Sequence, residues 1–364
     1  MRISDITREL EKIAPLALQE SYDNSGLLVG NATDPCERAL ITLDCTEAVI
    51  DEAISKNCDL VIAHHPIIFG GLKKLNGKNY VERTVIKAIK NNVAIYAIHT
   101  NLDNAAEGVN KKLADKIGLK NLRVLSPGKN QLKKLVTFVP TARHEHVRKA
   151  IFDAGAGHID KYDQCSYNIA GHGTFRAGEG TTPFAGKQGE LHTEPEIRLE
   201  TIYPVWLESA IIKALLEAHP YEEVAYDLYP LSNDLSQTGS GMLGALDHAI
   251  ETAAFLAQLK TALGLKVIRY TPFGKTVQKV AICGGAGSFL LRDAIAQGAD
   301  AFVTADFKYH QFFDAEDRLL IADVGHFESE KFTVELLAEL IQKKFPKFAL
   351  LLSETNTNPV NYYY

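Results

Sequence analysis

The chain has 364 residues, 46% of them hydrophobic and 23% charged, with a formal net charge of -6 at pH 7. This is the composition of a globular protein of two or three domains, and its scattered Lys and Arg residues exclude the basic stripe of a nucleic-acid-binding protein. Its apolar stretches fall short of the roughly 20 residues that a membrane-spanning helix needs, so no membrane contact is expected. Five cysteines without a CxxC pair, behind an amino terminus unlike a secretion signal, predict a reducing, cytoplasmic location.

The first part of the chain alternates apolar and amphipathic segments. An amphipathic helix opens the sequence, and continuous apolar runs then predict buried strands separated by helices. The expected strands are 39–44, 59–65 and 93–99, and the expected helices are 46–57, 80–92 and 108–118. This alternation predicts an α/β fold with a largely parallel sheet.

The segment 131–236 has a different order of elements. Its pattern predicts β-α-β-β-α-β, the ferredoxin-like order, with a long hairpin rich in Gly and Thr at 171–190. The stretches SPGKNQ before it and LSNDLSQTGSGMLG after it resemble loops. We therefore expect an inserted α+β domain at 131–236, between core halves at 1–130 and 237–364.

The second core half repeats the pattern of the first. Residues 39–66 align with 280–307 without a gap, which brings Ile41 onto Ile282. The expected elements of this half are strands 279–285, 300–306 and 318–325 and helices 288–298 and 328–344. The repeat predicts a pseudo-symmetric α/β core built from two halves.

Polar residues follow the expected strands at three places. They are His64 and His65, then His99 and Asp103, then His326 and Glu330. Because the carboxyl ends of strands in open α/β sheets meet at a crevice, these side chains are expected to converge. His326 and Glu330 stand four residues apart, on one face of a helix start. Each residue alone could be an ordinary strand-end or helix-start residue, but imidazoles and carboxylates from both halves favour a metal site.

The ligand types indicate which ions would bind. Imidazole and carboxylate suit Zn, Mn, Fe or Co, and the absence of cysteine among them argues against a closed structural zinc site. Five ligands exceed the usual set of one catalytic zinc, so two divalent ions are expected, with Asp103 or Glu330 as the bridge. A water shared by two cations would be a hydroxide near neutral pH, ready to attack an electrophilic carbon or phosphorus. The expected ion pair therefore favours hydrolysis.

Three further residues are candidate catalytic groups near this site. His99 would orient a ligand or contact the substrate, or it only caps a strand. Lys308 and His310, together with Asp306, follow the strand that corresponds to the one ending in the histidine doublet. All three would lie in the same cleft, where Lys308 and His310 would meet an anionic substrate, or they are solvated loop residues.

Five stretches together resemble one known family. They are YDNSGLLVG, LVIAHHPIIF, AIHTNLDNAAEGVN, TADFKYHQ and DVGHFESE, and they are similar to sequences of the Nif-three-like family, often described as type 2 GTP cyclohydrolase homologues. The resemblance implies two divalent ions, usually zinc. Their ligands would be His64, His65, Asp103, His326 and Glu330.

The resemblance also implies a domain organisation and an assembly. The insert would be a PII- or CutA-like domain that ends in HPYEEVAYDLYPL, and the protein would be a toroidal homohexamer, a trimer of dimers with its sites facing an inner cavity. TADFKYHQ lacks the glycine expected before its acid, which leaves the role of Asp306 open.

Two functions follow from these observations. The first is a metal-dependent hydrolase of a nucleotide-like substrate, and the resemblance implies that it converts GTP into formate and a ring-opened product. The second is a metal-binding regulatory or scaffold protein whose inserted domain recognises a partner without catalytic turnover, because a fold does not fix a function. Activity and assembly after metal removal distinguish the two.

Overall fold

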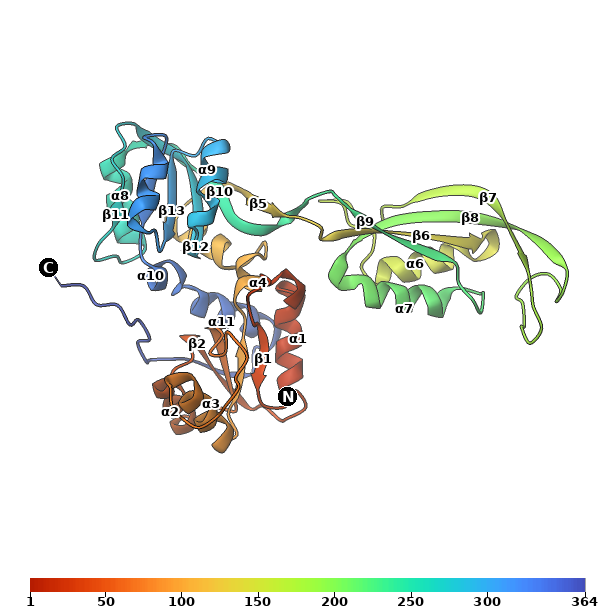
Figure 1. Cartoon of the computed structure of the whole chain (residues 1–364), viewed down its shortest axis with the longest axis horizontal. Coiled ribbons are helices and arrows are strands. Elements are labelled where there is room, and N and C mark those ends of the chain that lie inside the picture. Colours follow the sequence, from red (N-terminus) through yellow and green to blue (C-terminus); the bar gives the residue numbers. More distant parts are fainter. Residues whose placement is uncertain (364) are drawn as a thin grey trace. The chain divides into compact units, whose positions relative to one another are not determined.

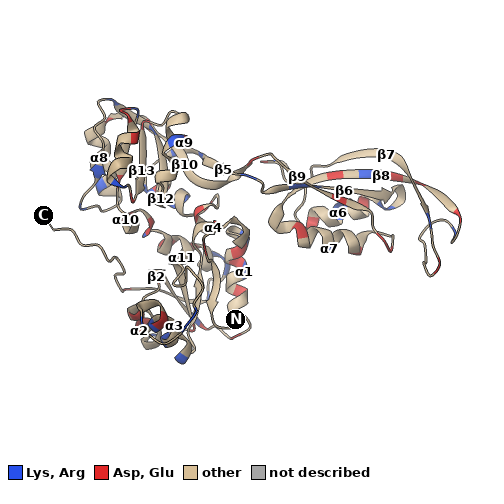
Figure 2. Cartoon of the chain, viewed as in Figure 1, with Lys and Arg blue, Asp and Glu red and all other residues tan. Residues whose placement is uncertain are grey.

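The computed structural model describes residues 1–363, which form two units (Figure 1). The first unit contains Met1–Pro127 and the chain from Gln237 onward, and the second contains Gly128–Ser236. Lys and Arg lie scattered among Asp and Glu in both units (Figure 2). None of the helices within residues 1–363 is both long and apolar enough to cross a membrane.

One sheet of the first unit carries the strands expected in the first core half. Its order is β1 (Gly26–Val29), β4 (Ala94–Ala97), β3 (Leu60–His65), β2 (Arg38–Asp44) and β15 (Ala349–Leu352). β4, β3, β2 and β15 are parallel, and β1 pairs antiparallel with β4 at the edge. β3 is apolar and fully buried from Leu60 to Ala63, as is typical of strands in parallel sheets that are covered by helices.

Four helices pack around this sheet. α2 (Glu47–Ser55) and α3 (Tyr80–Lys90) share a core cluster with β2, β3 and β4 through Val49, Ile50 and Val85. α11 (Thr333–Lys344) contacts β2 and α1 (Ile3–Ile13). α2 begins where its sequence predicts, because the Thr46 side chain accepts a hydrogen bond from the backbone N–H of Val49 at 3.3 Å.

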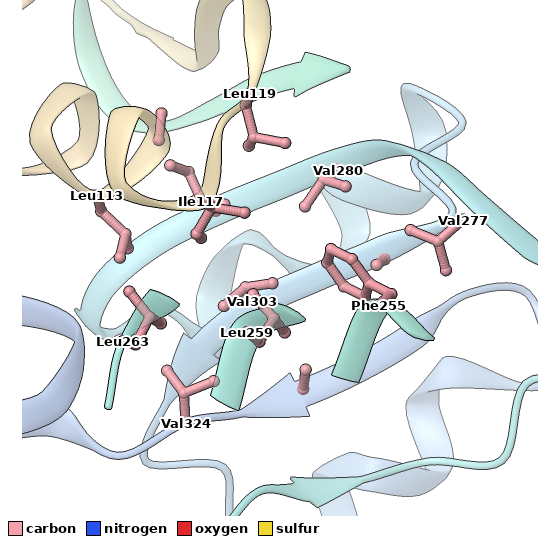
Figure 3. Close-up of a cluster of buried hydrophobic side chains, with 14 of the residues drawn as sticks. Leu113, Ile117, Leu119, Phe255, Leu259, Leu263, Val277, Val280, Val303 and Val324 are labelled. Carbon is pink, nitrogen blue, oxygen red and sulfur yellow. The ribbon is translucent and has the colours of Figure 1, made fainter. Parts of the chain in front are cut away.

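The other sheet of the first unit carries the strands of the second core half. Its order is β11 (Arg269–Tyr270), β14 (Leu320–Asp323), β13 (Ala301–Ala305), β12 (Thr276–Ala286), β10 (Leu235–Glu251) and β5 (Lys120–Gly128). β12, β13 and β14 are parallel. Figure 3 shows side chains of α5 (Val109–Ile117) and α8 (Thr252–Ala262), among them Ile117 and Phe255, packed against Val280 and Val303 of this sheet.

The two halves share their strand register. β2 pairs with β3 so that Ile41 lies opposite Ile62, and β12 pairs with β13 so that Ile282 lies opposite Val303. The alignment of 39–66 with 280–307 relates these two pairs residue by residue. The pseudo-symmetric α/β core predicted from the sequence is therefore confirmed.

The second unit has the ferredoxin-like order of elements. They are β6 (Leu132–Pro140), α6 (His144–Asp153), β7 (Tyr167–Arg176), β8 (Leu191–Pro204), α7 (Glu208–Ala218) and β9 (Tyr226–Leu231). Its sheet has the order β7-β8-β6-β9, and all neighbours are antiparallel. Val147 of α6, Ile211 of α7 and Leu199 of β8 belong to one core, so both helices cover the same face of the sheet.

The predicted loop at 231–244 is confirmed at residues 232–234 and is wrong from Leu235 onward. β10 begins at Leu235, and its residues Met242–Ala245 pair with β12. A sequence rich in Gly and Ser lacks the apolar alternation by which a strand is recognised. The strand forms because β12 offers it an edge to pair with, which local sequence does not reveal.

Two predicted helices are also shorter than expected. The helix predicted at 328–344 is divided into α10 (His326–Glu330) and α11, with the break at Lys331 and Phe332. The helix predicted at 288–298 is a 3-10 turn followed by α9 (Leu291–Ala296). Both segments carry a helical apolar pattern, which predicts the type of element better than its ends.

Candidate metal centre

The five predicted ligands come together at the carboxyl ends of core strands. His64 and His65 end β3, Asp103 ends α4 (Thr100–Asp103) after β4, and α10 after β14 carries His326 and Glu330. The spacing of four residues on α10 puts His326 Nε2 and Glu330 Oε2 3.1 Å apart. All but His64 line a cavity of about 860 Å³, and His64 lies fully buried beside it.

Glu330 is the carboxylate that joins the cluster. Its Oε1 lies 3.9 Å from His64 Nε2, and its Oε2 lies 2.9 Å from His65 Nε2. Two groups of candidate ligands share it, and in each group the ligand atoms lie within 4.8 Å of one another. The groups are His64, Asp103 and Glu330, and His65, His326 and Glu330. Of the two bridges considered from the sequence, Glu330 is the one that both groups contain.

His64 carries a nitrogen without a hydrogen-bond partner. Burial lowers the pKa of His64 to about 4, so its ring is neutral at pH 7. Its Nδ1 donates to the Ile98 carbonyl at 2.8 Å, which leaves Nε2 with a lone pair and no proton. This Nε2 lies 3.6 Å from Asp103 Oδ1, and both atoms are buried and unpaired within residues 1–363. Burial and the nearby charge of Glu330 raise the pKa of Asp103 well above its ordinary value, so this carboxyl tends to keep a proton that a bound cation would replace.

The other two histidines compensate the charge of the carboxylates. Although burial disfavours the charged rings, hydrogen bonds to Asp44 and Glu330 raise the pKa of His65 to about 10. In the same way Glu330 and Asp306 raise the pKa of His326 to about 9. Burial alone would raise the pKa of Glu330, but its hydrogen bonds with the histidines hold that pKa well below its ordinary value. Without an ion, protons on His65 and His326 thus supply the positive charge beside Glu330. A bound metal ion would replace these protons.

The Nδ1 atoms of His65 and His326 each donate a hydrogen bond to a carboxylate. Asp44 Oδ1 accepts from His65 Nδ1 at 2.7 Å, and Asp306 Oδ2 accepts from His326 Nδ1 at 2.7 Å. Such bonds fix the ring orientation of metal-ligating histidines and point the second nitrogen at the ion. The role that the sequence left open for Asp306 is therefore a contact with His326. Sequence reasoning missed Asp44, although it ends β2 opposite His65 in register, at the sheet edge where ligands were expected.

His99 lies beside the two strand-end histidines. Its ring centroid is 5.3 Å from those of His64 and His65, and its Nδ1 donates to Asp23 Oδ1 at 2.8 Å. Asp23 also accepts from the backbone N–H of Thr100 at 3.0 Å. Although burial acts in the opposite direction, these hydrogen bonds lower the pKa of Asp23. His99 is thus oriented at the cavity, and its Nε2 makes no hydrogen bond to the described part of the chain.

Lys308 and His310 are not brought to the cavity. Both are exposed, and neither is among the residues that line it. Lys308 precedes a 3-10 helix (Tyr309–Ala315), in which His310 lies against the rings of Tyr309 and Phe313. This arrangement gives no support to a catalytic role for either residue and fits the solvated-loop alternative.

Exposed aromatic rings surround the cavity. Tyr22, Phe69, Tyr80 and Phe289 line it, and each is more than half exposed. Aromatic faces in a concave site stack on flat ligands. The cavity therefore combines a cluster of groups that could hold a metal ion with exposed aromatic walls.

Residues 353–362, which we call the C-terminal segment, contribute to the wall of the cavity, and sequence reasoning missed them. Thr357 lines the cavity and donates its hydroxyl to Asp44 Oδ2 at 2.6 Å. Glu52 of α2 holds the start of the segment by accepting from the Thr355 hydroxyl at 2.6 Å. The segment is thus connected to the candidate ligands through Asp44, which accepts hydrogen bonds from both Thr357 and His65.

Comparisons with known proteins show the family and the fold of the chain. The model of the family described as Duf34/NIF3 (NGG1p interacting factor 3) matches residues 1–359. A Halalkalibacterium halodurans protein named GTP cyclohydrolase 1 type 2 homolog is 41% identical over 359 residues, which cover 97% of this chain and 96% of that protein. A Bacillus subtilis protein of the same name is 39% identical over 364 residues, covering 98% and 97%. Among solved structures, a Bacillus cereus protein related to NIF3 is 39% identical with a TM-score of 0.86, covering 100% of this chain and 99% of that one.

Proposed function

Because the chain belongs to the DUF34/NIF3 family, we propose that it is a metal-dependent hydrolase of a nucleotide-like substrate. GTP, converted into formate and a ring-opened product, is the proposed substrate, since relatives bear the name GTP cyclohydrolase 1 type 2 homolog. Two divalent ions would be held by His64, His65, Asp103, His326 and Glu330. The observation that carries the proposal is the pair of buried, unpaired atoms, His64 Nε2 and Asp103 Oδ1.

The donor set suits zinc, with Mn, Fe and Co as further candidates. It consists of imidazole nitrogens and carboxylate oxygens, with Glu330 as the proposed bridge. Bound ions would supply Lewis acidity toward an electrophilic carbon and would lower the pKa of a water in the cavity. Since His65 and His326 carry protons without an ion, metal uptake is expected to release protons.

The chain's own residues would bind the substrate and move a proton. The aromatic rings of Tyr22, Phe69, Tyr80 and Phe289 would hold the heterocycle by stacking. His99, oriented at Nδ1 by Asp23, would hold or accept a proton at Nε2. The C-terminal segment would exclude water from its side of the cavity.

The assembly and the compartment belong to the same proposal. We expect a toroidal homohexamer, a trimer of dimers, because the sequence resemblance implies it, and mass photometry measures it. The five cysteines are free, which supports a reducing cytoplasm.

Formate release from GTP tests the enzymatic function. Protein loaded with Zn, Mn, Fe or Co should release formate with at least one of these ions, and His64→Ala should lose that activity. His310→Ala is the matched control, because His310 is exposed and lies outside the cavity. Absence of turnover with GTP and with a panel of nucleotides and phosphoesters, for every ion, would contradict the proposal.

A second candidate function is regulation through the inserted unit. One observation favours it, because this unit has a cavity of its own, of about 660 Å³. The ions would then be structural or sensed. An oligomer that dissociates on chelation, together with an inactive loaded protein, favours regulation. An intact oligomer that loses turnover on chelation favours catalysis.

A further inference from the structure

The inserted unit contains a cavity that the metal centre does not use. We propose that this cavity binds a small amine that contains a flat aromatic ring, with its amino or ammonium N–H group on the ring or on a short stem. β7, β8, the hairpin loop between them (residues 177–190) and residues 221–225 line most of it. All of its lining residues lie within Gly128–Ser236. Its volume of about 660 Å³ is in the range of small-molecule sites.

Aromatic rings form its walls. Tyr221 lies between Phe175 of β7 and Phe184 of the hairpin loop, with ring centroids 5.7 and 6.2 Å away. Phe138 of β6 adds a further ring to the lining. Rings at these positions offer both edges and faces to a flat ligand.

The hairpin loop is tied down over the cavity. The backbone N–H of Thr182 donates to both carboxylate oxygens of Glu222, at 3.1 and 3.2 Å. This contact connects the loop with the segment that precedes β9. It keeps Phe184 on the wall of the cavity.

Glu196 of β8 places a carboxylate inside the cavity. It is only 7% exposed, and its Oε1 accepts the hydroxyl of Tyr221 at 2.8 Å. Within residues 1–363, Oε2 accepts no hydrogen bond and no Lys, Arg or His pairs with this carboxylate. Oε2 is not among the fully buried side-chain atoms that lack a partner, so it is open to a donor that enters the cavity. A ligand N–H group would supply the missing donor through a charge-assisted hydrogen bond.

Two glycines of β7 keep the space around this carboxylate open. A Cβ atom on Gly173 would lie 2.1 Å from Glu196 Oε2, whereas a Cβ atom on Gly171 would meet nothing within 4 Å. Gly171 lies opposite Glu196 in the strand register. Glycine inside a strand weakens it and often marks a place where a ligand approaches closely. Gly173 thus makes room for the carboxylate, and Gly171 leaves room for a ligand next to it.

The charges of the cavity favour an amine over an anion. Three glutamates and two arginines line it. One of these arginines, Arg198, already donates to Glu200 at 2.8 Å. An anionic ligand would be repelled by Glu196, whereas an amine would donate to it.

Two probes test the proposal on the full-length, metal-loaded protein. 2-Aminopurine riboside carries its amine on the ring and loses fluorescence when it stacks on aromatic side chains. Tryptamine carries an ammonium group on a flexible stem, and calorimetry measures its binding. At least one probe should bind saturably with one site per chain, and the probe that binds identifies which kind of amine is recognised. If neither binds, the proposal is overturned.

Variants place the bound probe in this cavity. Glu196→Gln keeps the size of the side chain and its bond from Tyr221, but it removes the charge, so binding should weaken at least about tenfold. Gly171→Val fills the open space without a collision and should abolish binding. Glu145→Gln, exposed on α6, is the control and should bind like the wild type.

Thermal melts check that each variant is folded. Unchanged affinity in a folded Glu196→Gln or Gly171→Val overturns the proposal, because the probe then binds elsewhere, for example at the metal centre. The proposal does not depend on hydrolase activity.

Discussion

Asp44→Asn tests whether the two candidate ligand groups that share Glu330 bind their ions with independent affinities. Asp44 accepts from His65 Nδ1 at 2.7 Å and from the Thr357 hydroxyl at 2.6 Å. Asparagine keeps the size and one acceptor oxygen but removes the negative charge. Of the two ligand groups that share Glu330, only one contains His65. The substitution should therefore weaken the binding of one ion and spare the other.

The magnitude follows from the position of Asp44 behind the ligand. Loss of an outer partner of a metal-ligating histidine weakens metal binding by about 10–100-fold, which corresponds to about 1.4–2.8 kcal/mol. The hydrogen bond to Asp44 helps to raise the pKa of His65 to about 10. Its loss therefore also makes the imidazole less basic and a weaker ligand for a metal ion. We expect the Kd of one ion to rise by this factor and that of the other to change less than about threefold.

Competition with a chromophoric zinc chelator resolves the two dissociation constants. Asp306→Asn makes the same change behind His326, which belongs to the same ligand group, and should weaken the same ion. Asp51→Asn is the control, because Asp51 forms an exposed ion pair with Lys87. Equal weakening of both ions by Asp44→Asn, or of neither, would refute the idea that Asp44 acts through His65.

Three further predictions concern the metal and the C-terminal segment. Glu330→Gln removes the shared carboxylate and should lower the metal content, measured by mass spectrometry, from about two ions per chain to less than one, whereas Asp103→Asn should retain one. Chelation should lower the melting temperature by a few degrees, because an ion at 100 times its Kd stabilises the folded protein by about 2.7 kcal/mol. A melting temperature that is the same with and without the metal would contradict this prediction. Although burial acts in the opposite direction, hydrogen bonds from a lysine and from the C-terminal segment lower the pKa of Glu52 from 4.5 to about 2. Its stabilisation is therefore complete above pH 4.5 and lost as the pH falls toward 2. The difference in the free energy of unfolding between the wild type and Glu52→Gln should shrink from roughly 3 kcal/mol at pH 7 toward zero. A difference that does not change with pH in denaturant titrations would contradict this assignment.

The convergence of the five candidate ligands could be predicted because local patterns position them. The apolar run of β3 ends at His64 and His65, and the spacing of four residues fixes the pair on α10. The repeated β-α-β pattern brings strand ends of both halves into equivalent places. These patterns position each candidate ligand within its own half, whereas the contact of His65 with Glu330 joins segments 265 residues apart.

Contacts between distant segments explain what could not be predicted. Glu52 and Thr355 are 303 residues apart in the chain, and β15 joins the first sheet beside β2 although it belongs to the second core half. The stretch SETNTNP has no apolar period or motif that marks it as part of a cavity wall. Its place depends on the carboxylates of Glu52 and Asp44, whose own roles appear only in the folded chain.

The repeat also explains why equivalent strand ends have different roles. His65 at the end of β3 corresponds in the alignment to Asp306 after β13. His65 directs Nε2 at Glu330 at 2.9 Å, whereas Asp306, with a φ of 59°, has left the strand and accepts from His326 Nδ1. One strand end therefore supplies a candidate ligand, and its counterpart orients a ligand that the next helix supplies. Asp306→His would replace the negatively charged acceptor of His326 Nδ1 by an uncharged imidazole, so it would weaken the site instead of adding a ligand. Duplication sets where the side chains converge, and the residue type at each position decides whether it binds or orients.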